Sequence, residues 1–152
     1  MYYFYLGNMI LPVTPKAVTF TYGGQNKTYS LIDDGEINIL KKGKLSEISF
    51  DFLLPAGNYA FKTTNNSGQE TYLKRIKLLK DQKKPFQFII VRSSSGMNFR
   101  TFTNIKVSIE DYGIKEEADN GLRMTVSIKL KEFKPYGTKR VSVKGNVATI
   151  QE

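Results

Sequence analysis

The stretch that decides the fold of this chain is Leu45-Ser46-Glu47-Ile48-Ser49-Phe50-Asp51-Phe52-Leu53-Leu54. Apolar and polar side chains alternate along it, so Ile48, Phe50 and Phe52 share one face of an extended strand. Pro55 ends the strand, because proline cannot donate a hydrogen bond to a ladder. We therefore expect a strand with one face in a hydrophobic core, and Phe50 as a member of that core.

The same alternation recurs on both sides of this stretch. The further candidate strands are 16–22, 27–32, 36–40, 86–91, 99–112 and 122–133. We predict that 16–22 and 27–32 form a hairpin across the short Gly-Gly turn at 23–26. The apolar run 86–91 predicts a central strand that is buried on both faces.

Helical spacing appears once in the chain, over 69–84. Within it Tyr72, Leu73, Ile76 and Leu79 form an apolar stripe, and Pro85 ends the helix. About seven hairpin-spaced strands with one helix indicate a mainly β fold. We predict an antiparallel β-barrel or sandwich in which the α-helix covers an open end or edge.

The two ends of the chain differ in composition from this body, which we place at 16–137. Residues 1–15 form an N-terminal aromatic arm, too short to span a membrane and without the pattern of a secretory signal. Its aromatic residues either pack on their own domain as an edge strand or dock on a neighbouring subunit. Those candidates for docking are Tyr2, Tyr3, Phe4 and Tyr5. Residues 138–152 are expected to be a C-terminal tail or one added strand.

The composition excludes several kinds of chemistry. The 152 residues contain no His, Cys or Trp, so disulfides, Cys/His zinc sites and Ser-His nucleophiles are ruled out. Acidic groups occur at 33–36, 110–111 and 116–119, where turns are expected, and none has the spacing of a calcium loop. Catalysis by paired carboxylates is the weaker alternative. We expect no enzyme, no cofactor and no metal.

Positive charge is concentrated in one region. The chain carries 23 basic and 14 acidic residues, a formal charge of +9, and 69–100 holds eight basic against two acidic residues. The basic candidates for docking are Lys74, Arg75, Lys77, Lys80, Lys83, Lys84, Lys139 and Arg140. An acidic protein partner is one interpretation of this face, and a nucleic-acid-binding β-barrel is the alternative. No known nucleic-acid-binding motif accompanies the charge.

Six stretches, in the same order and with similar spacing, resemble a known family. They are 11–15, 31–40, 45–55, 84–92, 107–112 and 126–137, with sequences such as LPVTP, KPFQFIIVR and VSIKLKEFKPYG. They resemble the N-terminal domain of the LysM-containing baseplate hub-adaptor proteins. That family belongs to contractile phage tails, phage-tail-like bacteriocins and related contractile injection systems.

This resemblance implies a tail-tube-like β fold and a structural role in the baseplate of a virion or phage-tail-like particle. The expected partners are the baseplate hub, the tail tube, and sheath-initiator or wedge proteins, with several copies in a ring of three or six or a multiple. No small-molecule substrate is implied. The sequence departs from the family at Glu152, about where a linker to the LysM module would begin, so cell-wall binding is not carried over: either the protein lacks this module or the module lies beyond Glu152.

Overall fold

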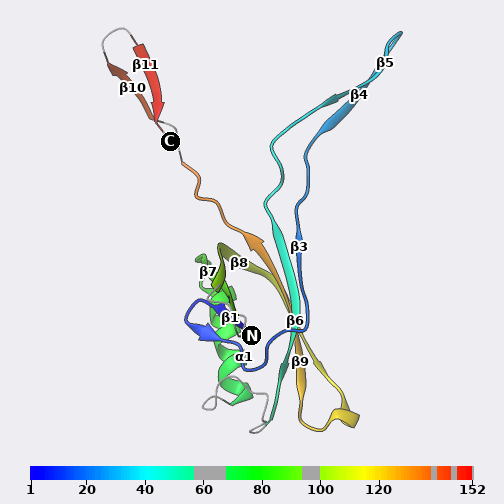
Figure 1. Cartoon of the computed structure of the whole chain (residues 1–152), viewed down its shortest axis with the longest axis vertical. Coiled ribbons are helices and arrows are strands. Elements are labelled where there is room, and N and C mark those ends of the chain that lie inside the picture. Colours follow the sequence, from blue (N-terminus) through cyan, green and yellow to red (C-terminus); the bar gives the residue numbers. More distant parts are fainter. Residues whose placement is uncertain (57–67, 94–99, 138–139, 145–146, 152) are drawn as a thin grey trace.

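The computed structural model describes residues 1–56, 68–93, 100–137, 140–144 and 147–151. The first half of the chain forms β1 (Tyr2–Leu6), β2 (Met9–Ile10), β3 (Val18–Thr21), β4 (Lys27–Leu31), β5 (Gly35–Ile39) and β6 (Glu47–Leu54). The second half forms α1 (Gln69–Asp81), β7 (Phe86–Ser93), β8 (Arg100–Glu116), the short 3₁₀ helix η1 (Ala118–Asn120), β9 (Met124–Glu132), β10 (Arg140–Lys144) and β11 (Val147–Gln151). This arrangement confirms the prediction of a mainly β fold with one α-helix (Figure 1).

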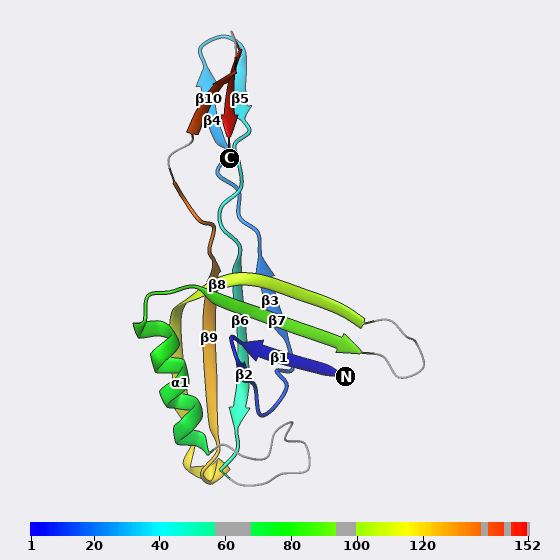
Figure 2. The same ribbon diagram turned by 90° about the vertical axis from the view of Figure 1, so that its left-hand side faces the viewer.

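The body is a seven-stranded antiparallel sheet in the order β2-β1-β7-β8-β9-β6-β3. The long strand β8 joins its two halves, because Val107 is paired with Phe86 of β7 on one side and Glu132 of β9 on the other. The pairing of β8 with β9 is irregular between Ile109 and Asp111, which fits a local bend. In Figure 2, β1 and β7 run across β6 and β9, so the sheet folds over on itself.

The core lies between the two halves of this sheet. Phe50 of β6 stacks on Phe88 of β7, with ring centroids 5.5 Å apart, and lies 6.1 Å from the ring of Phe4. Ile48, Phe50 and Phe52 are all buried, as their alternation predicts. Aromatic pairs at these distances add to the stabilisation that burial of apolar area provides.

The helix closes one side of the core, and its phase agrees with the predicted stripe. Tyr72 and Ile76 are buried, whereas Leu78 is 63% exposed. The helix ends at Asp81 rather than at 84, because Lys83 adopts a positive φ of 53° that no α-helix continues through. At the other end, the Gln69 side-chain amide donates to the Leu54 carbonyl at 2.8 Å and so ties the helix start to β6.

The aromatic start of the chain packs on its own domain. β1 pairs with β7 from Tyr2 opposite Arg92 to Leu6 opposite Phe88. Gly7, with φ of 60°, then turns the chain into β2. The sequence left two alternatives open for this segment: packing on its own domain as a strand, or docking on a neighbouring subunit. The structure shows the first.

The predicted hairpin of 16–22 with 27–32 is wrong. β3 pairs with β6, with Val18 opposite Phe50, and β4 pairs with β5 around a turn that Gly35 closes at φ of 80°. The Gly-Gly segment is part of the connection between β3 and β4, where the Gly23 carbonyl accepts from the Lys44 amide at 2.8 Å. Residues 18–54 are therefore one long hairpin whose tip projects from the body (Figure 1).

The prediction that 86–91 is buried on both faces is also wrong. Phe86, Phe88 and Ile90 of β7 are buried, but Gln87 is exposed and Ile89 is only half-buried. The face of β7 that carries Phe86, Phe88 and Ile90 belongs to the core, to which the helix and the other half of the sheet also contribute. Within the described residues, the second face has no comparable cover.

Candidate functional site

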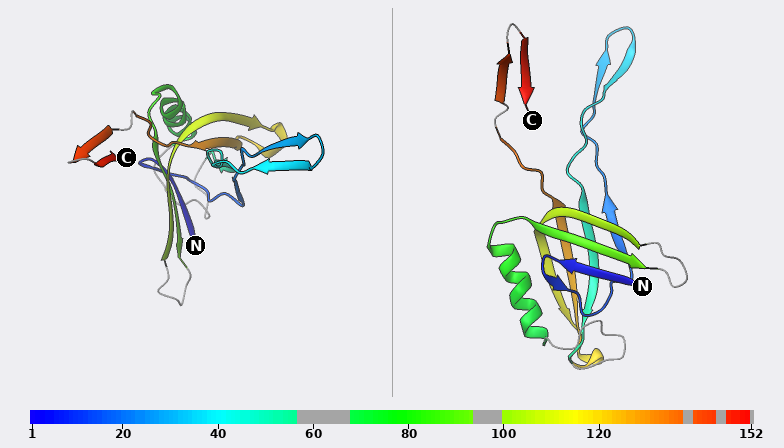
Figure 3. Two further views of the ribbon diagram at one scale, coloured as in Figure 1. Left: turned by 90° about the horizontal axis from the view of Figure 1, so that it is seen from above. Right: turned by 60° about the vertical axis from the view of Figure 1, so that its left-hand side comes forward.

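The most conspicuous surface is the tip of the long hairpin, which we call the projecting hairpin (residues 27–39: β4, the turn and β5). All ten of its strand residues are exposed, and it stands clear of the sheet (Figures 1 and 3). Cross-strand pairs place Tyr29 opposite Ile37 and Leu31 opposite Gly35 on one face, with Ile39 opposite Lys27. The other face carries Thr28, Ser30, Glu36 and Asn38.

The projecting hairpin is therefore amphipathic but has nothing to bury its apolar face against. Tyr29, Leu31, Ile37 and Ile39 are each 40–48% exposed, and Ile32 at the turn is fully exposed. A two-stranded hairpin is marginally stable in water unless its apolar face is covered. Contiguous exposed apolar side chains and open strand edges are features of protein docking surfaces.

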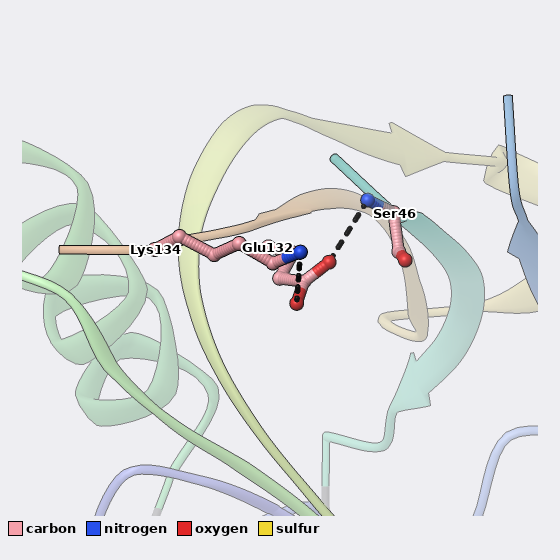
Figure 4. Close-up of polar contacts among 3 residues, drawn as sticks. All are labelled: Ser46, Glu132 and Lys134. Atoms are coloured by element: carbon pink, nitrogen blue, oxygen red, sulfur yellow. Dashed lines mark hydrogen bonds and ion pairs between the residues drawn. The ribbon is translucent and has the colours of Figure 1, made fainter. Parts of the chain in front are cut away.

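A carboxylate anchors the root of this long hairpin to the body. The Ser46 amide donates to Glu132 Oε2 at 3.1 Å (Figure 4), and the Glu132 amide donates back to the Ser46 carbonyl at 2.8 Å. Lys134 Nζ lies 3.9 Å from Glu132 Oε1. The hydrogen bond from the Ser46 amide, helped by Lys134, lowers the pKa of Glu132 below its usual range.

We expect this carboxylate to make folding stability depend on pH. A glutamate with a lowered pKa stabilises the fold above its unfolded pKa of about 4.3, and this contribution is lost as the pH falls through the folded value. Glu132→Gln should therefore cost about 1 kcal/mol at pH 7 and progressively less below about pH 4. Urea unfolding at several pH values measures this. The exposed Glu110→Gln is the control, and equal pH profiles for both variants would contradict the anchor.

The predicted basic residues of the helix region are all exposed. Arg75, Lys77 and Lys80 of α1 are exposed, and Lys74 makes an exposed i,i+4 ion pair with Glu70 at 3.5 Å. Such a pair contributes little to stability. Lys83 and Lys84 follow the helix and are also exposed. The structure thus brings these six cations to one part of the surface, and their docking role stays a prediction.

The other predicted docking residues divide into three groups. Phe4 is 4% exposed and belongs to the core, so its prediction as a docking residue is wrong: the β1–β7 pairing turns it inward. Tyr2 is exposed, and Tyr3 and Tyr5 are half-buried on the same strand. Arg140 begins β10, which pairs with β11, and Lys139 lies outside the described residues.

The acidic groups do not converge on one site. Asp33 and Asp34 form the turn of the projecting hairpin, while Glu110 and Asp111 lie on β8. Glu117 pairs with Lys115 at 2.5 Å near η1. In the described part of the chain, no group of three or more acidic side chains could hold a metal ion. No helix among these residues is long and apolar enough to cross a membrane.

A cleft of about 600 Å³ lies at the edge of the sheet, where β3 begins. Val13, Thr14 and Ala17 form one wall, and Phe50, Phe52 and Leu53 of β6 contribute to the other. Sequence reasoning identified neither this cleft nor the projecting hairpin. Asp34-Gly35 between two alternating runs was the signal for the hairpin, because that dipeptide favours tight hairpin turns.

Comparison with known proteins adds a fold relationship. No protein-family model matches the chain. The uncharacterized protein YqbP of Bacillus subtilis (strain 168) is 29% identical over 136 residues, which cover 88% of this chain. The chain spans only 58% of the length of that relative. A solved structure of the SPP1 tail tube is similar with a TM-score of 0.56 and 13% identity, over 86% of this chain and 71% of that one. The tail-tube-like fold is thereby confirmed.

Proposed function

We propose that this chain is a structural component of a phage tail or phage-tail-like particle, and that it acts by protein–protein contacts rather than by catalysis. The observation that carries this proposal is the projecting hairpin, whose apolar face lies open on a fold similar to that of the SPP1 tail tube. A domain that works alone gains nothing from such a face, whereas a subunit of an assembly buries it against its neighbour.

We place the chain more specifically in the baseplate, between the central hub or tube and the surrounding wedge or sheath-initiator proteins. The ordered resemblance over 11–137 supports this location. A ring of copies, in a multiple of three or six, fits a tube-like subunit. The exposed cations of α1 suit an acidic neighbour in that ring, because complementary charge steers and orients docking.

Composition of purified particles tests this function. We expect the tagged chain to co-purify with tube and sheath proteins at a constant ratio, as measured by quantitative mass spectrometry. Deletion of its gene should remove complete tails from electron micrographs, and the wild-type gene supplied in trans should restore them. Complete, purified particles that lack the chain would overturn the proposal.

A further inference from the structure

We propose that the projecting hairpin of one copy docks into the cleft of a second copy, where it adds a strand to the open edge of β6. This inference rests on the proposed structural function and names the partner of its docking surface. Three observations carry it: a sheet edge in the cleft that no described strand pairs with, a hairpin that has a free edge and an apolar face, and the separation of the two surfaces along β6.

The cleft contains a sheet edge without a neighbour. β6 pairs with β9 along its whole length, from Glu47 to Leu54. β3 reaches only Val18, opposite Phe50, so the described strands leave Asp51–Leu54 paired on one side only. Such an edge presents backbone donors and acceptors that accept an additional strand. The apolar wall of the cleft, with Val13 and Ala17, offers contacts to alternate side chains of that strand.

The projecting hairpin has free strand edges and an apolar face, which could pair with the open edge of β6. Its strands pair only with each other in the described structure, so each has a free edge as well as the apolar face of Tyr29, Leu31, Ile37 and Ile39. Its charge is also opposite in sign to that of the rest of the chain. Residues 27–39 contain one Lys, two Asp and one Glu, a charge of −2 in a chain of +9, which leaves +11 on the remaining residues. The cleft itself is lined by one cation and one carboxylate, Lys16 and Asp51, so the charge complementarity is with the body as a whole and not with the cleft alone.

The positions of the two surfaces require a second copy. The hairpin leaves the body beyond Thr21 and Glu47, whereas the cleft is lined by Ser49–Leu53, farther along β6. Figure 1 shows the hairpin pointing away from the sheet at the end where β6 begins. A chain therefore presents its hairpin to a neighbour and receives the hairpin of another. Such a head-to-tail contact closes into a ring or extends as a stack.

Mixing of two variants of the purified full chain tests this contact. Ile37→Lys with Ile39→Lys removes the apolar face of the hairpin, and Ala17→Arg with Thr19→Arg blocks the cleft. All four positions are exposed or largely so, and thermal melts check that both variants fold. Thr28→Lys with Asn38→Lys, on the polar face of the hairpin, is the matched control.

Sedimentation velocity over a concentration series gives the readout. We expect the wild type and the control to self-associate, and each of the two variants alone to remain a monomer. Their equimolar mixture should form a species of twice the monomer mass and nothing larger, because only one intact hairpin can meet one intact cleft.

Three results would overturn the contact: a wild type that is monomeric at every concentration, a cleft variant that associates like the wild type, or a mixture that stays monomeric. Each leaves the particle-composition test of the proposed function unaffected. A monomeric chain that is nevertheless present in particles would mean that the hairpin binds a different protein. A chain absent from particles would instead refute the structural function itself.

Discussion

Phe50→Ala is expected to lower the free energy of unfolding by about 3–5 kcal/mol, the usual cost of removing a large aromatic side chain from a core. Phe50 is 4% exposed and its ring contacts those of Phe4, Phe52 and Phe88. The truncation therefore leaves a cavity at the place where β1, β6 and β7 meet. Stability of small domains is only about 5–15 kcal/mol, so a loss of this size is a large share of the total.

Ser49→Ala is the matched control for this truncation, because Ser49 is the neighbouring residue on the exposed face of β6. Substitutions at such positions usually change stability by less than about 0.5 kcal/mol. Urea unfolding followed by circular dichroism measures both variants. Equal stability of Phe50→Ala and the wild type would show that the faces of β6 are reversed, and the core described above would then be wrong.

The core was predictable from the sequence because it depends on local periodicity. Alternation in 45–54 identified the buried face of β6, and helical spacing identified Tyr72 and Ile76. Both patterns report which face of an element is apolar, and the fold buries that face in each case.

Strand pairing was harder to predict, because it depends on distant residues. Periodicity does not say which strand lies beside β3, and the nearest Gly-Gly turn suggested β4, whereas the actual neighbour is β6. The strong turn is at Asp34-Gly35, so one hairpin spans 18–54 and carries its irregular stretch in the middle. Alternation like that of 27–39 is typical of a strand with one buried face, yet no part of the described chain covers the apolar face of this hairpin.

The cleft had no signal in the sequence at all. It exists because β3 begins only at Val18, beside Phe50, while β6 continues to Leu54, and this difference in length is a property of two segments about 30 residues apart. Likewise the exposure of the second face of β7 follows from the absence of a covering layer in the described structure. Such features become visible only when the elements are placed in space.

Ile76→Asp should be the most destabilising single change in the helix. Ile76 has no exposed surface and lies in the core between α1 and the sheet. Aspartate there removes an apolar side chain, which lowers the free energy of unfolding by about 2–5 kcal/mol. It also buries a carboxyl group that has no hydrogen-bonding partner in the core, which lowers stability further. We expect a total loss above about 4 kcal/mol, which is exceptional for a point mutation and comparable to the stability of a small domain.

Leu78→Asp, two residues along the same helix, is the decisive comparison, because Leu78 is 63% exposed. It should change stability by less than about 0.5 kcal/mol and leave the helical signal intact. Urea unfolding of both variants then tests the rotation of α1 about its axis. That rotation also decides the docking surface, since the same phase that buries Ile76 turns Lys74, Arg75 and Lys77 toward solvent. Equal losses for the two variants would contradict the phase, and the basic face would no longer be available to a partner.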